Sequence, residues 1–224
     1  MFNLKAKRIL QHRKIIITAG GTIEPIDPVR FIGNSSSGKM GLALVREFKR
    51  YTKNIILIHA RISIPVPRGV RSIQALTVED MYQAIKKNMD NSTIIIMPAA
   101  VSDYRVKKVS RNKIKKGKNL NLTLVPTRDI LKSLAQDKKA THYFVGFAAE
   151  SKDIVKNARK KLHDKNLDMI VANPAGTKNS PFGSDFNQVY IITRDRTIKT
   201  GRVKKQKIAK IMVKEVIKNL SKNI

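Results

Sequence analysis

Short apolar runs alternate with helical patterns along most of this sequence, and this alternation restricts the fold more than any other feature. Residues 14–19, 54–59 and 93–97 are runs of strand length that are rich in Ile. Between them, residues 37–50 and 77–87 repeat apolar side chains at the spacing of an amphipathic helix. A strand, a helix and a second strand in this order form a βαβ unit, so a mainly parallel sheet is expected.

The same alternation continues towards the C-terminus. We expect strands at 120–125, 143–147 and 167–172, helices at 129–136, 152–165 and 205–220, and a hairpin of 187–193 with 197–203. Residues 104–119 are lysine-dense without an apolar period, which indicates an exposed flap. The prediction is an α/β fold: a three-layer αβα, Rossmann-like, mainly parallel sheet with an antiparallel hairpin and a lysine-rich flap. A basic N-terminal extension at 1–13 is expected to precede a single domain at 14–224.

Composition excludes several kinds of site. The chain has no cysteine, so disulfides, thiolate zinc sites and a cysteine nucleophile are ruled out. Its histidines are far apart and share no ligand spacing, so no metal site built from protein side chains is expected. No apolar run approaches the ~20 residues of a membrane-spanning helix, and the basic N-terminus lacks the apolar stretch of a secretory signal. These features predict a cytoplasmic protein.

The formal net charge of +30 would suit a nucleic-acid-binding protein, because lysine and arginine neutralise phosphates and release counterions. The basic residues, however, are spread along the whole chain, and aromatic residues, on which bases could stack, make up only 5% of it. We therefore favour a small polyanion, such as a triphosphate, as the ligand that this charge attracts. A basic nucleic-acid-binding protein remains an alternative.

Ligands of parallel α/β sheets bind beyond the carboxyl ends of the strands, so the loop at 19–39 is of particular interest. Gly20 and Gly21 directly follow the first strand, where glycine lets the backbone approach a ligand closely. Residues 33–40 (GNSSSGKM) nearly match a P-loop, but Met40 stands where Ser or Thr should hold Mg²⁺. A P-loop-type NTPase is thus a second alternative. Ser36 or Ser37 is expected to cap the helix that follows, whose first N–H groups suit a phosphate or carboxylate.

Three further features carry possible chemistry. Asp103 lies in the AAVSDYR segment after the third strand, where it either accepts hydrogen bonds from a ligand or binds its own turn. The lysines of 113–116 (KIKK) are either a solvated surface or a flap that closes over a triphosphate. Lys161 and Lys165 lie beside the inward apolar stripe of their helix, so they either extend outward to water or meet buried anions.

Taken together and in order, these segments resemble one family: phosphopantothenate–cysteine ligase, also called phosphopantothenoylcysteine synthetase. The similar stretches are 17–41 (ITAGGTIEPIDPVRFIGNSSSGKMG), 99–105 (AAVSDYR), 113–116 (KIKK), 145–151 (VGFAAES), 158–173 (ARKKLHDKNLDMIVAN) and 182–187 (FGSDFN). The resemblance extends from about residue 14 to the C-terminus. It implies an enzyme of coenzyme A biosynthesis, in a form where the synthetase domain stands alone.

The resemblance implies a CTP-dependent reaction in two steps. 4′-Phosphopantothenate is activated as an acyl-cytidylate with release of pyrophosphate, and L-cysteine then displaces CMP to give 4′-phosphopantothenoylcysteine. Mg²⁺ is implied as a cofactor that accompanies the triphosphate. The family also implies a homodimer and a separate flavin-dependent decarboxylase that acts next in the pathway, with no specific nucleic acid and no membrane as partners.

Site residues follow from the same resemblance. Catalytic roles match Asn34 and Lys113. Nucleotide binding matches Gly20, Pro98, Ala99, Ala100, Asp103, Lys113, Arg128, Asp129, Ile130, Leu131, Phe147, Lys161 and Lys165, and substrate binding matches Asn34, Ser36, Ser37, Gly38 and Lys39. The chain departs from the family pattern at three places: Gly33 and Ser35 replace Ser and a basic residue, Thr127-Arg128-Asp129 replaces Asn-Pro-Asp, and Asn173-Pro174 replaces Asn-Asp.

Overall fold

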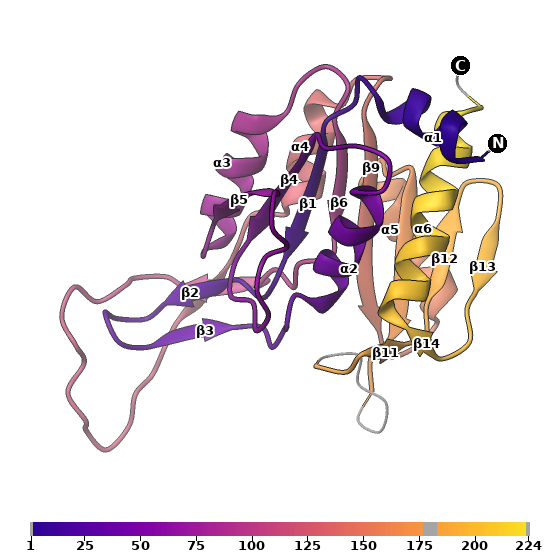
Figure 1. The fold of residues 1–224 in the computed structure, drawn as a ribbon. Coiled ribbons are helices and arrows are strands. Elements are labelled where there is room, and N and C mark those ends of the chain that lie inside the picture. The colour runs from indigo at the N-terminus through magenta and orange to yellow at the C-terminus, as the bar shows by residue number, and fades with distance from the viewer. Residues whose placement is uncertain (1, 177–182, 223–224) are drawn as a thin grey trace.

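The computed structural model describes residues 2–176 and 183–222. Its centre is a sheet of eight strands in the order β13-β12-β10-β9-β6-β1-β4-β5 (Figure 1). The strands are β1 (Ile15–Ala19), β4 (Ile55–His59), β5 (Arg71–Gln74), β6 (Ile94–Met97), β9 (Tyr143–Glu150), β10 (Met169–Pro174), β12 (Tyr190–Thr193) and β13 (Thr197–Lys199). All strands from β10 to β5 run parallel, whereas β12 and β13 form an antiparallel hairpin. The predicted α/β fold is confirmed.

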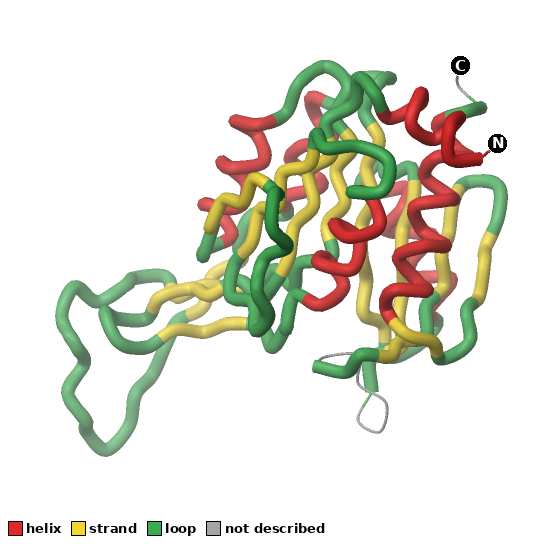
Figure 2. Tube along the Cα trace, viewed as in Figure 1, coloured by secondary structure: helices red, strands yellow, loops and turns green. Residues whose placement is uncertain are grey.

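Helices cover both faces of this sheet, as Figures 1 and 2 show. One layer contains α1 (Phe2–Leu10), α2 (Lys39–Phe48) and α6 (Lys205–Leu220), and the other contains α3 (Val78–Asn88), α4 (Ile130–Leu134, continued by a 3-10 turn at Ala135–Asp137) and α5 (Ile154–Asp164). In β1, Ile15 and Ile17 join the core under α2 and α6, whereas Ile16 joins the core under α3 and α5. A strand covered on both faces has to be apolar throughout, which explains the isoleucine run.

Helix capping follows the sequence in one case and not in another. Thr77, the first residue of the helix expected at 77–87, caps α3 in a capping box with Asp80, so that each side chain accepts from the backbone N–H of the other residue. The cap predicted for α2 is wrong: its N-cap is Gly38, and neither Ser36 nor Ser37 caps the helix. Gly38 has φ of 75°, a left-handed conformation that glycine adopts without strain, and Ser36 Oγ reaches only the Gly38 N–H, at 3.5 Å.

Small antiparallel pairs beside the main sheet form a projection that we call the arm. It comprises the hairpin β2 (Ile23–Pro25) with β3 (Phe31–Gly33), and the pair β7 (Tyr104–Val106) with β8 (Leu124–Pro126), which is joined by residues 107–123. Figure 1 shows the arm extending away from the helices, at the lower left. The strand predicted at 120–125 is wrong in its start and its place, because β8 begins at Leu124 and lies outside the main sheet. The flap predicted at 104–119 is wrong at its start, because residues 104–106 form β7, but the lysine-dense residues 107–119 contain no helix or strand.

Further elements were not predicted from the sequence, including β5. A short pair of β11 (Phe186–Asn187) with β14 (Val203–Lys204) directly precedes α6. The basic N-terminus forms α1, which packs on α6 and buries Ala6, Ile9 and Leu10 in the core. The division into an extension and a domain beginning at residue 14 stays a prediction. Within the described residues, no helix combines the length and the hydropathy that a bilayer-spanning segment requires.

Truncation of a buried side chain in α1 tests whether the N-terminal residues contribute to the stability of the domain. Leu10→Ala should lower the free energy of unfolding by about 2–4 kcal/mol, because it opens a space at a fully buried position. Leu4→Ala changes the same residue type in the same helix at a position that is 75% exposed, and should shift stability by no more than about 0.5 kcal/mol. Urea denaturation measures both variants, and equal effects would contradict the packing of α1.

Candidate functional site

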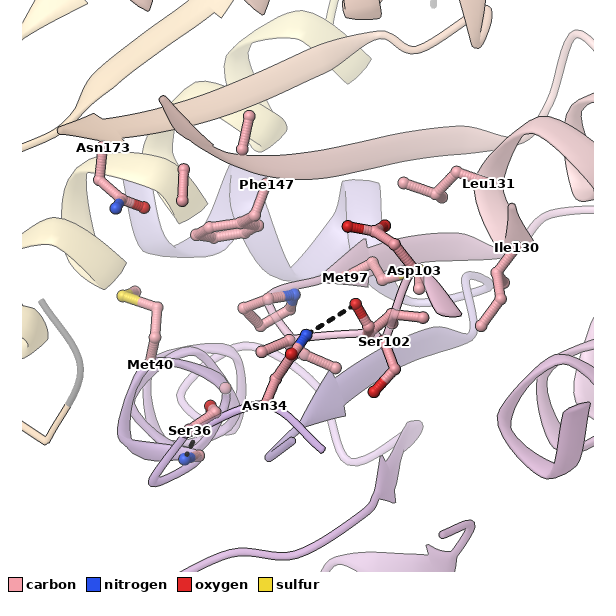
Figure 3. A pocket seen from close by; sticks show the side chains of 18 of the residues that line it. Asn34, Ser36, Met40, Met97, Ser102, Asp103, Ile130, Leu131, Phe147 and Asn173 are labelled. Atoms are coloured by element: carbon pink, nitrogen blue, oxygen red, sulfur yellow. Dashed lines mark hydrogen bonds between the residues drawn. The ribbon is translucent and has the colours of Figure 1, made fainter. Parts of the chain in front are cut away.

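A cavity of about 410 Å³ opens at the carboxyl edge of the parallel strands (Figure 3). Its walls come from residues 34 and 36–41, which lead into α2, 97–103 after β6, 127–131 at the start of α4, and 147–149 in β9. Lys161, Lys165, Asn173, Asn187 and Lys205 complete the lining. The location follows from the topology, because the carboxyl ends of parallel strands and their loops meet at one edge of the sheet.

The cavity brings together most of the residues that the sequence indicated. Its lining includes Asn34, Ser36, Ser37, Gly38, Lys39, Pro98, Ala99, Ala100, Asp103, Arg128, Asp129, Ile130, Leu131, Phe147, Lys161 and Lys165. Gly20 and Lys113 are not part of that lining. Phe182, the first residue of the FGSDFN stretch, lies outside the described residues.

Gly20 and Gly21 act through the backbone. Gly20 has φ of 85°, and a Cβ at Gly21 would lie 1.9 Å from the backbone oxygen of Asn34, so no side chain fits there. The absence of a side chain at Gly21 therefore allows the Asn34 loop to lie directly against the end of β1. Residues 33–40 follow β3 rather than β1, which is not the position of a P-loop.

Asn34 is itself exposed, but it is bonded to a polar network that is buried. Its Nδ2 donates to the backbone oxygen of Val101 over 2.9 Å, the bond dashed in Figure 3. The backbone oxygen of Thr22 accepts a hydrogen bond from the Asn34 N–H. The backbone N–H of Ser102 in turn donates to Thr22 Oγ1 over 2.8 Å. Thr22 and Ser102 are almost fully buried, so these hydrogen bonds are protected from competition with water. The network fixes the Asn34 backbone relative to residues 99–103, and the exposed bond to Val101 orients the Asn34 amide.

The lysines of α5 line the cavity, as their position beside the inward stripe predicted. Lys161 Nζ lies 2.6 Å from a carboxylate oxygen of Glu150, and Lys165 Nζ lies 2.8 Å from one of Asp129. Asp129 also caps α4 by accepting from the backbone N–H of Lys132. The carboxylates hold both ammonium groups at the wall, so an anion that enters the cavity meets cations that are already oriented.

Arg128 occupies the position where the family pattern has proline. Its guanidinium stacks 4.3 Å from the ring centre of Tyr82, and its Nε donates to Glu79 over 3.0 Å. This hydrogen bond and the charge of Arg128 contribute to a pKa of Glu79 below its ordinary value, after the larger effect of a hydrogen bond from Gln83. Both contacts are with α3, which therefore orients this arginine at the rim of the cavity.

The structure also adds lining residues that sequence reasoning missed. These are Met40, Gly41, Met97, Val101, Ser102, Thr127, Ala148, Ala149, Asn173, Asn187 and Lys205. Most of them have apolar or small side chains, which carry no signal of a binding site in the sequence. Lys205 did have a signal, because it lies three positions before Ile208 on the buried side of α6.

The flap that carries Lys113 is tied to the β2–β3 hairpin by three residues that we call the clasp: Asp27, Arg30 and Ile114. The buried Asp27 carboxylate accepts from the backbone N–H groups of Val29, Arg30 and Ile114 over 2.8–3.1 Å, and the Arg30 guanidinium donates to the Ile114 backbone oxygen. Burial acts to raise the pKa of Asp27, but these donors and the charge of Arg30 outweigh it and hold that pKa below its ordinary value. The clasp fixes the chain next to Lys113.

Known proteins give an independent view of the same chain. A family model described as the DNA/pantothenate metabolism flavoprotein C-terminal domain matches residues 10–220. The chain is 36% identical over 212 residues to the coenzyme A biosynthesis bifunctional protein CoaBC of Escherichia coli strain K12, covering 93% of this chain and 52% of that protein. It thus spans about half the length of the curated relatives it matches.

Solved structures agree with this match. The C-terminal domain of a coenzyme A biosynthesis bifunctional protein CoaBC has a TM-score of 0.78 at 34% identity, covering 96% of this chain and 98% of that chain. A Cab2 variant in complex with phosphopantothenate-cysteine has a TM-score of 0.75 at 17% identity, covering 99% of this chain and 94% of that chain. The second likeness shows the fold alone.

Removal of the Asp27 charge tests the clasp. Asp27→Asn should speed tryptic cleavage within residues 107–118 by about tenfold, because an amide nitrogen cannot accept from the Ile114 N–H. Because the pKa of Asp27 is lowered on folding, its stabilising effect is present above the ordinary pKa of 3.8 and is lost as the pH falls through the lowered value. At neutral pH the clasp of the wild-type protein is therefore intact, and digestion at that pH compares each variant with this intact state.

The control for that experiment is Asp195→Asn, which removes the same charge from an aspartate that pairs with Lys222, away from the arm. Its flap should be cleaved at the wild-type rate. Equal cleavage rates in all three proteins would show that Asp27 does not hold the flap.

Proposed function

The chain belongs to the family of the DNA/pantothenate metabolism flavoprotein C-terminal domain, and from this premise we propose that it is a phosphopantothenate–cysteine ligase of coenzyme A biosynthesis. One observation carries the proposal. Asn34, Asp103, Phe147, Lys161 and Lys165 are distant in the sequence, and all of them line one cavity at the carboxyl edge of the sheet. These are the residues on which the resemblance to the ligase family depends.

The reaction joins an acid to an amine in two steps. The carboxylate of 4′-phosphopantothenate attacks the α-phosphorus of CTP, a carboxyl oxygen–phosphorus bond forms, and pyrophosphate leaves. The amine of L-cysteine then attacks the acyl carbon, an amide bond forms, the amine loses a proton, and CMP leaves. Negative charge grows on phosphate oxygens in the first step and on the carbonyl oxygen in the second, so fixed cations and N–H donors accelerate both steps.

We assign Asn34 to the acyl-nucleotide intermediate. The hydrogen bond from its Nδ2 to Val101 and the Thr22–Ser102 network support this assignment, because they fix the amide before substrate arrives. A group that is already ordered loses little conformational freedom on binding, and this advantage is greatest for a short-lived intermediate. Ser36, Ser37, Gly38 and Lys39, which lead into α2, are proposed to bind 4′-phosphopantothenate.

We assign the nucleotide to the part of the cavity formed by β6, β9, α4 and α5. Small residues at 98–100 leave room for a flat base and a sugar, and the Phe147 ring lies at the middle of the cavity (Figure 3). Asp103, Arg128, Asp129, Ile130 and Leu131 form the adjoining wall. Lys161 and Lys165 supply positive charge, each worth less than the ~4 kcal/mol of a near-surface pair at 4 Å, because both side chains are partly exposed.

Mg²⁺ is proposed to arrive with the triphosphate. Among residues 2–176 and 183–222, no three His, Cys, Asp or Glu side chains gather as metal ligands, so the available donors fit an ion whose ligands are mainly phosphate oxygens and water. When bound, the ion neutralises charge on the triphosphate. Of the two aspartates that line the cavity, Asp129 is engaged by Lys165 and the start of α4, so Asp103 would be the one to hold such an ion.

A homodimer is proposed from the surface of the arm. Large apolar side chains are exposed there in unusual number: Val29, Phe31, Tyr104, Val109, Leu120, Leu122 and Leu124. Exposed apolar surface of this kind favours contact with another protein, and a second copy of the chain is the occupant that the family resemblance implies.

Lys113 is then proposed to reach the reaction centre when the flap closes. The enzyme is proposed to act in the cytoplasm, ahead of a flavin-dependent decarboxylase.

A coupled assay tests the function as a whole. Pyrophosphate should appear only when both 4′-phosphopantothenate and CTP are present, and CMP should appear only when L-cysteine is added as well. The same assay with ATP measures which nucleotide is preferred. Pyrophosphate release that ignores 4′-phosphopantothenate would overturn the proposal and favour a simple NTPase.

Asn34→Asp should leave the fold intact and lower turnover by roughly a hundredfold or more. The substitution replaces a donor to the Val101 oxygen by a carboxylate, which repels that oxygen and the phosphates of the substrates. The matched control is Asn54→Asp, because Asn54 also donates an amide hydrogen to a backbone oxygen, that of Arg13, but away from the cavity. Near-normal turnover of Asn34→Asp with a normal melting temperature would remove Asn34 from the mechanism.

Lys161→Ala should raise the KM for CTP by about tenfold and change kcat less, because it removes a cation and leaves the Glu150 carboxylate facing the phosphates. Lys160→Ala removes the same charge from the exposed side of α5 and should behave like the wild type. If the two variants have the same KM for CTP, Lys161 does not bind the nucleotide.

A further inference from the structure

A second pair of lysines lines the cavity from the opposite helical layer. Lys39 begins α2 and Lys205 begins α6, and both helices lie on the face of the sheet that also carries α1. On the other face, Lys161 belongs to α5 and Lys165 directly follows that helix. The family resemblance assigns no role to Lys205. Its position on the wall of the cavity therefore calls for a physical explanation.

Lys205 is buried to an extent that is unusual for lysine. Only 7% of the residue is exposed, because it lies on the same side of α6 as Ile208 and Met212, whose side chains fill the core. Burial lowers the pKa of Lys205, and the nearby charge of Lys39 lowers it further, while Asp185 acts in the opposite direction. Two neighbouring ammonium groups at a buried cavity wall repel each other, and a phosphate oxyanion placed between them would reduce that repulsion.

The local helix geometry adds to this unfavourable placement. A cation in the first turn of a helix opposes the helix dipole, and the first turn of α6 contains no acidic residue. Such a position contradicts the usual preference for acidic residues at helix starts. Departures of this kind from local preference are typical of functional sites.

The start of α2 adds positive potential at the same place. Residues 36–41 line the cavity, and no side chain caps α2, so its first-turn N–H groups are not satisfied by a capping side chain. Gly41 also lets α2 approach β1 closely, since a Cβ there would lie 2.6 Å from the Thr18 backbone oxygen. A helix start of this kind favours an anion, and here two lysines accompany it.

The carboxylate that acts on both lysines is easily displaced. Asp185 lies 2.7 Å from Lys39 Nζ, yet 71% of its side chain is exposed. Glu150, the partner of Lys161, is only 12% exposed, so water competes much more strongly for Asp185 than for Glu150. An incoming dianion can therefore replace Asp185 beside Lys39.

We propose that Lys205, together with Lys39 and the first turn of α2, binds a phosphoryl group of a substrate. The proposal rests on the proposed function, which supplies two phosphorylated substrates: the terminal phosphates of the nucleoside triphosphate and the phosphate of 4′-phosphopantothenate. Both present the same chemistry, a phosphate oxyanion that accepts hydrogen bonds from ammonium groups. In Figure 3, Met40 and Asn173 mark one end of the cavity, with Phe147 between them and Leu131. The proposed site lies towards Met40, the neighbour of Lys39.

Calorimetric titration with inorganic pyrophosphate, at fixed ionic strength, tests this site without requiring catalysis. Lys205→Met keeps most of the side-chain volume and removes the charge, and it should weaken pyrophosphate binding roughly tenfold to a hundredfold. Lys39→Met should have a similar effect, and Lys205→Arg should keep most of the affinity. Lys207→Met, which removes an exposed lysine of the same helix, should bind like the wild type.

Titrations with the substrates identify the source of the phosphoryl group. A loss of affinity for CTP, with unchanged affinity for CMP and 4′-phosphopantothenate, assigns the site to the terminal phosphates of the nucleotide. A loss for 4′-phosphopantothenate, with pantothenate binding unchanged, assigns it to the phosphate of the acid. The proposal would be overturned if Lys205→Met bound all of these ligands as tightly as the wild-type protein does, at an equal melting temperature. It would also be overturned if the wild-type protein bound no pyrophosphate.

The coupled assay separates this inference from the function on which it rests. Pyrophosphate binding that depends on Lys205 in a protein without ligase turnover would support the site and contradict the proposed function. Ligase turnover with unchanged substrate KM values in Lys205→Met would support the function and contradict the site.

Discussion

The backbone of Gly20 and Gly21 continues the pairing of β1 beyond the end of the regular sheet, and the cavity depends on this extension. Gly21 exchanges hydrogen bonds with Arg61 on one side, while Gly20 and Thr22 bond to Ala100 on the other. The third neighbour is the Asn34 loop, which approaches Gly21 so closely that no side chain could be accommodated. Three loops are thus fixed to one dipeptide, although none of them belongs to a strand of the main sheet. Rigid backbone at this point is what allows side chains from distant segments to share a small volume.

Charge at the cavity is arranged on top of this backbone frame. The net charge of +30 is spread over the surface, where water screens it, and it says little about where an anion binds. At the cavity the lysines are instead held by specific partners: Glu150 and Asp129 on the α5 side, and Asp185 on the α2 side. The difference in exposure among these carboxylates gives the two sides different properties. The α5 side is an oriented ion-pair network, and the α2 side is a site from which the carboxylate can be exchanged for a ligand.

The sequence predicted those parts of the fold that depend on hydrophobic periodicity. Strands such as β1 and β6 are buried on both faces and have to be apolar throughout, so their isoleucine runs are unambiguous. The β2–β3 hairpin of the arm was missed because it contributes little to the core. Phe31 and Val29 are exposed, so the hydrophobic pattern of that segment does not follow burial. Helix α1 was missed because its many basic residues concealed a short buried stripe.

The same distinction applies to the candidate site. Asn34, Asp103 and the lysines of α5 were found because they lie in segments with a strong family signature or on a readable helix face. Ser102 and Asn173 also lie in stretches that resemble the family, but they were missed because the sequence does not show which polar side chains of such a stretch face the cavity. Lys205 was missed for another reason: one lysine among many at a helix start attracts no attention until its burial is known. Burial is a property of the folded chain, and the sequence indicates it only through the period of the neighbouring apolar residues.

The clasp gives the flap a defined resting position, and this bears on how Lys113 can contribute to the reaction. A fully disordered flap would lose the conformational freedom of every residue on closing, at roughly 1–2 kcal/mol per residue. Because Asp27 and Arg30 hold the backbone at Ile114, the chain next to Lys113 is already ordered before any ligand arrives. In the proposed closure, substrate binding then has to drive only the movement of the arm or the approach of a second copy against its exposed apolar side chains. If the arm closes as proposed, a cation carried on it joins the two lysine pairs at a smaller entropic penalty than one carried on a free loop.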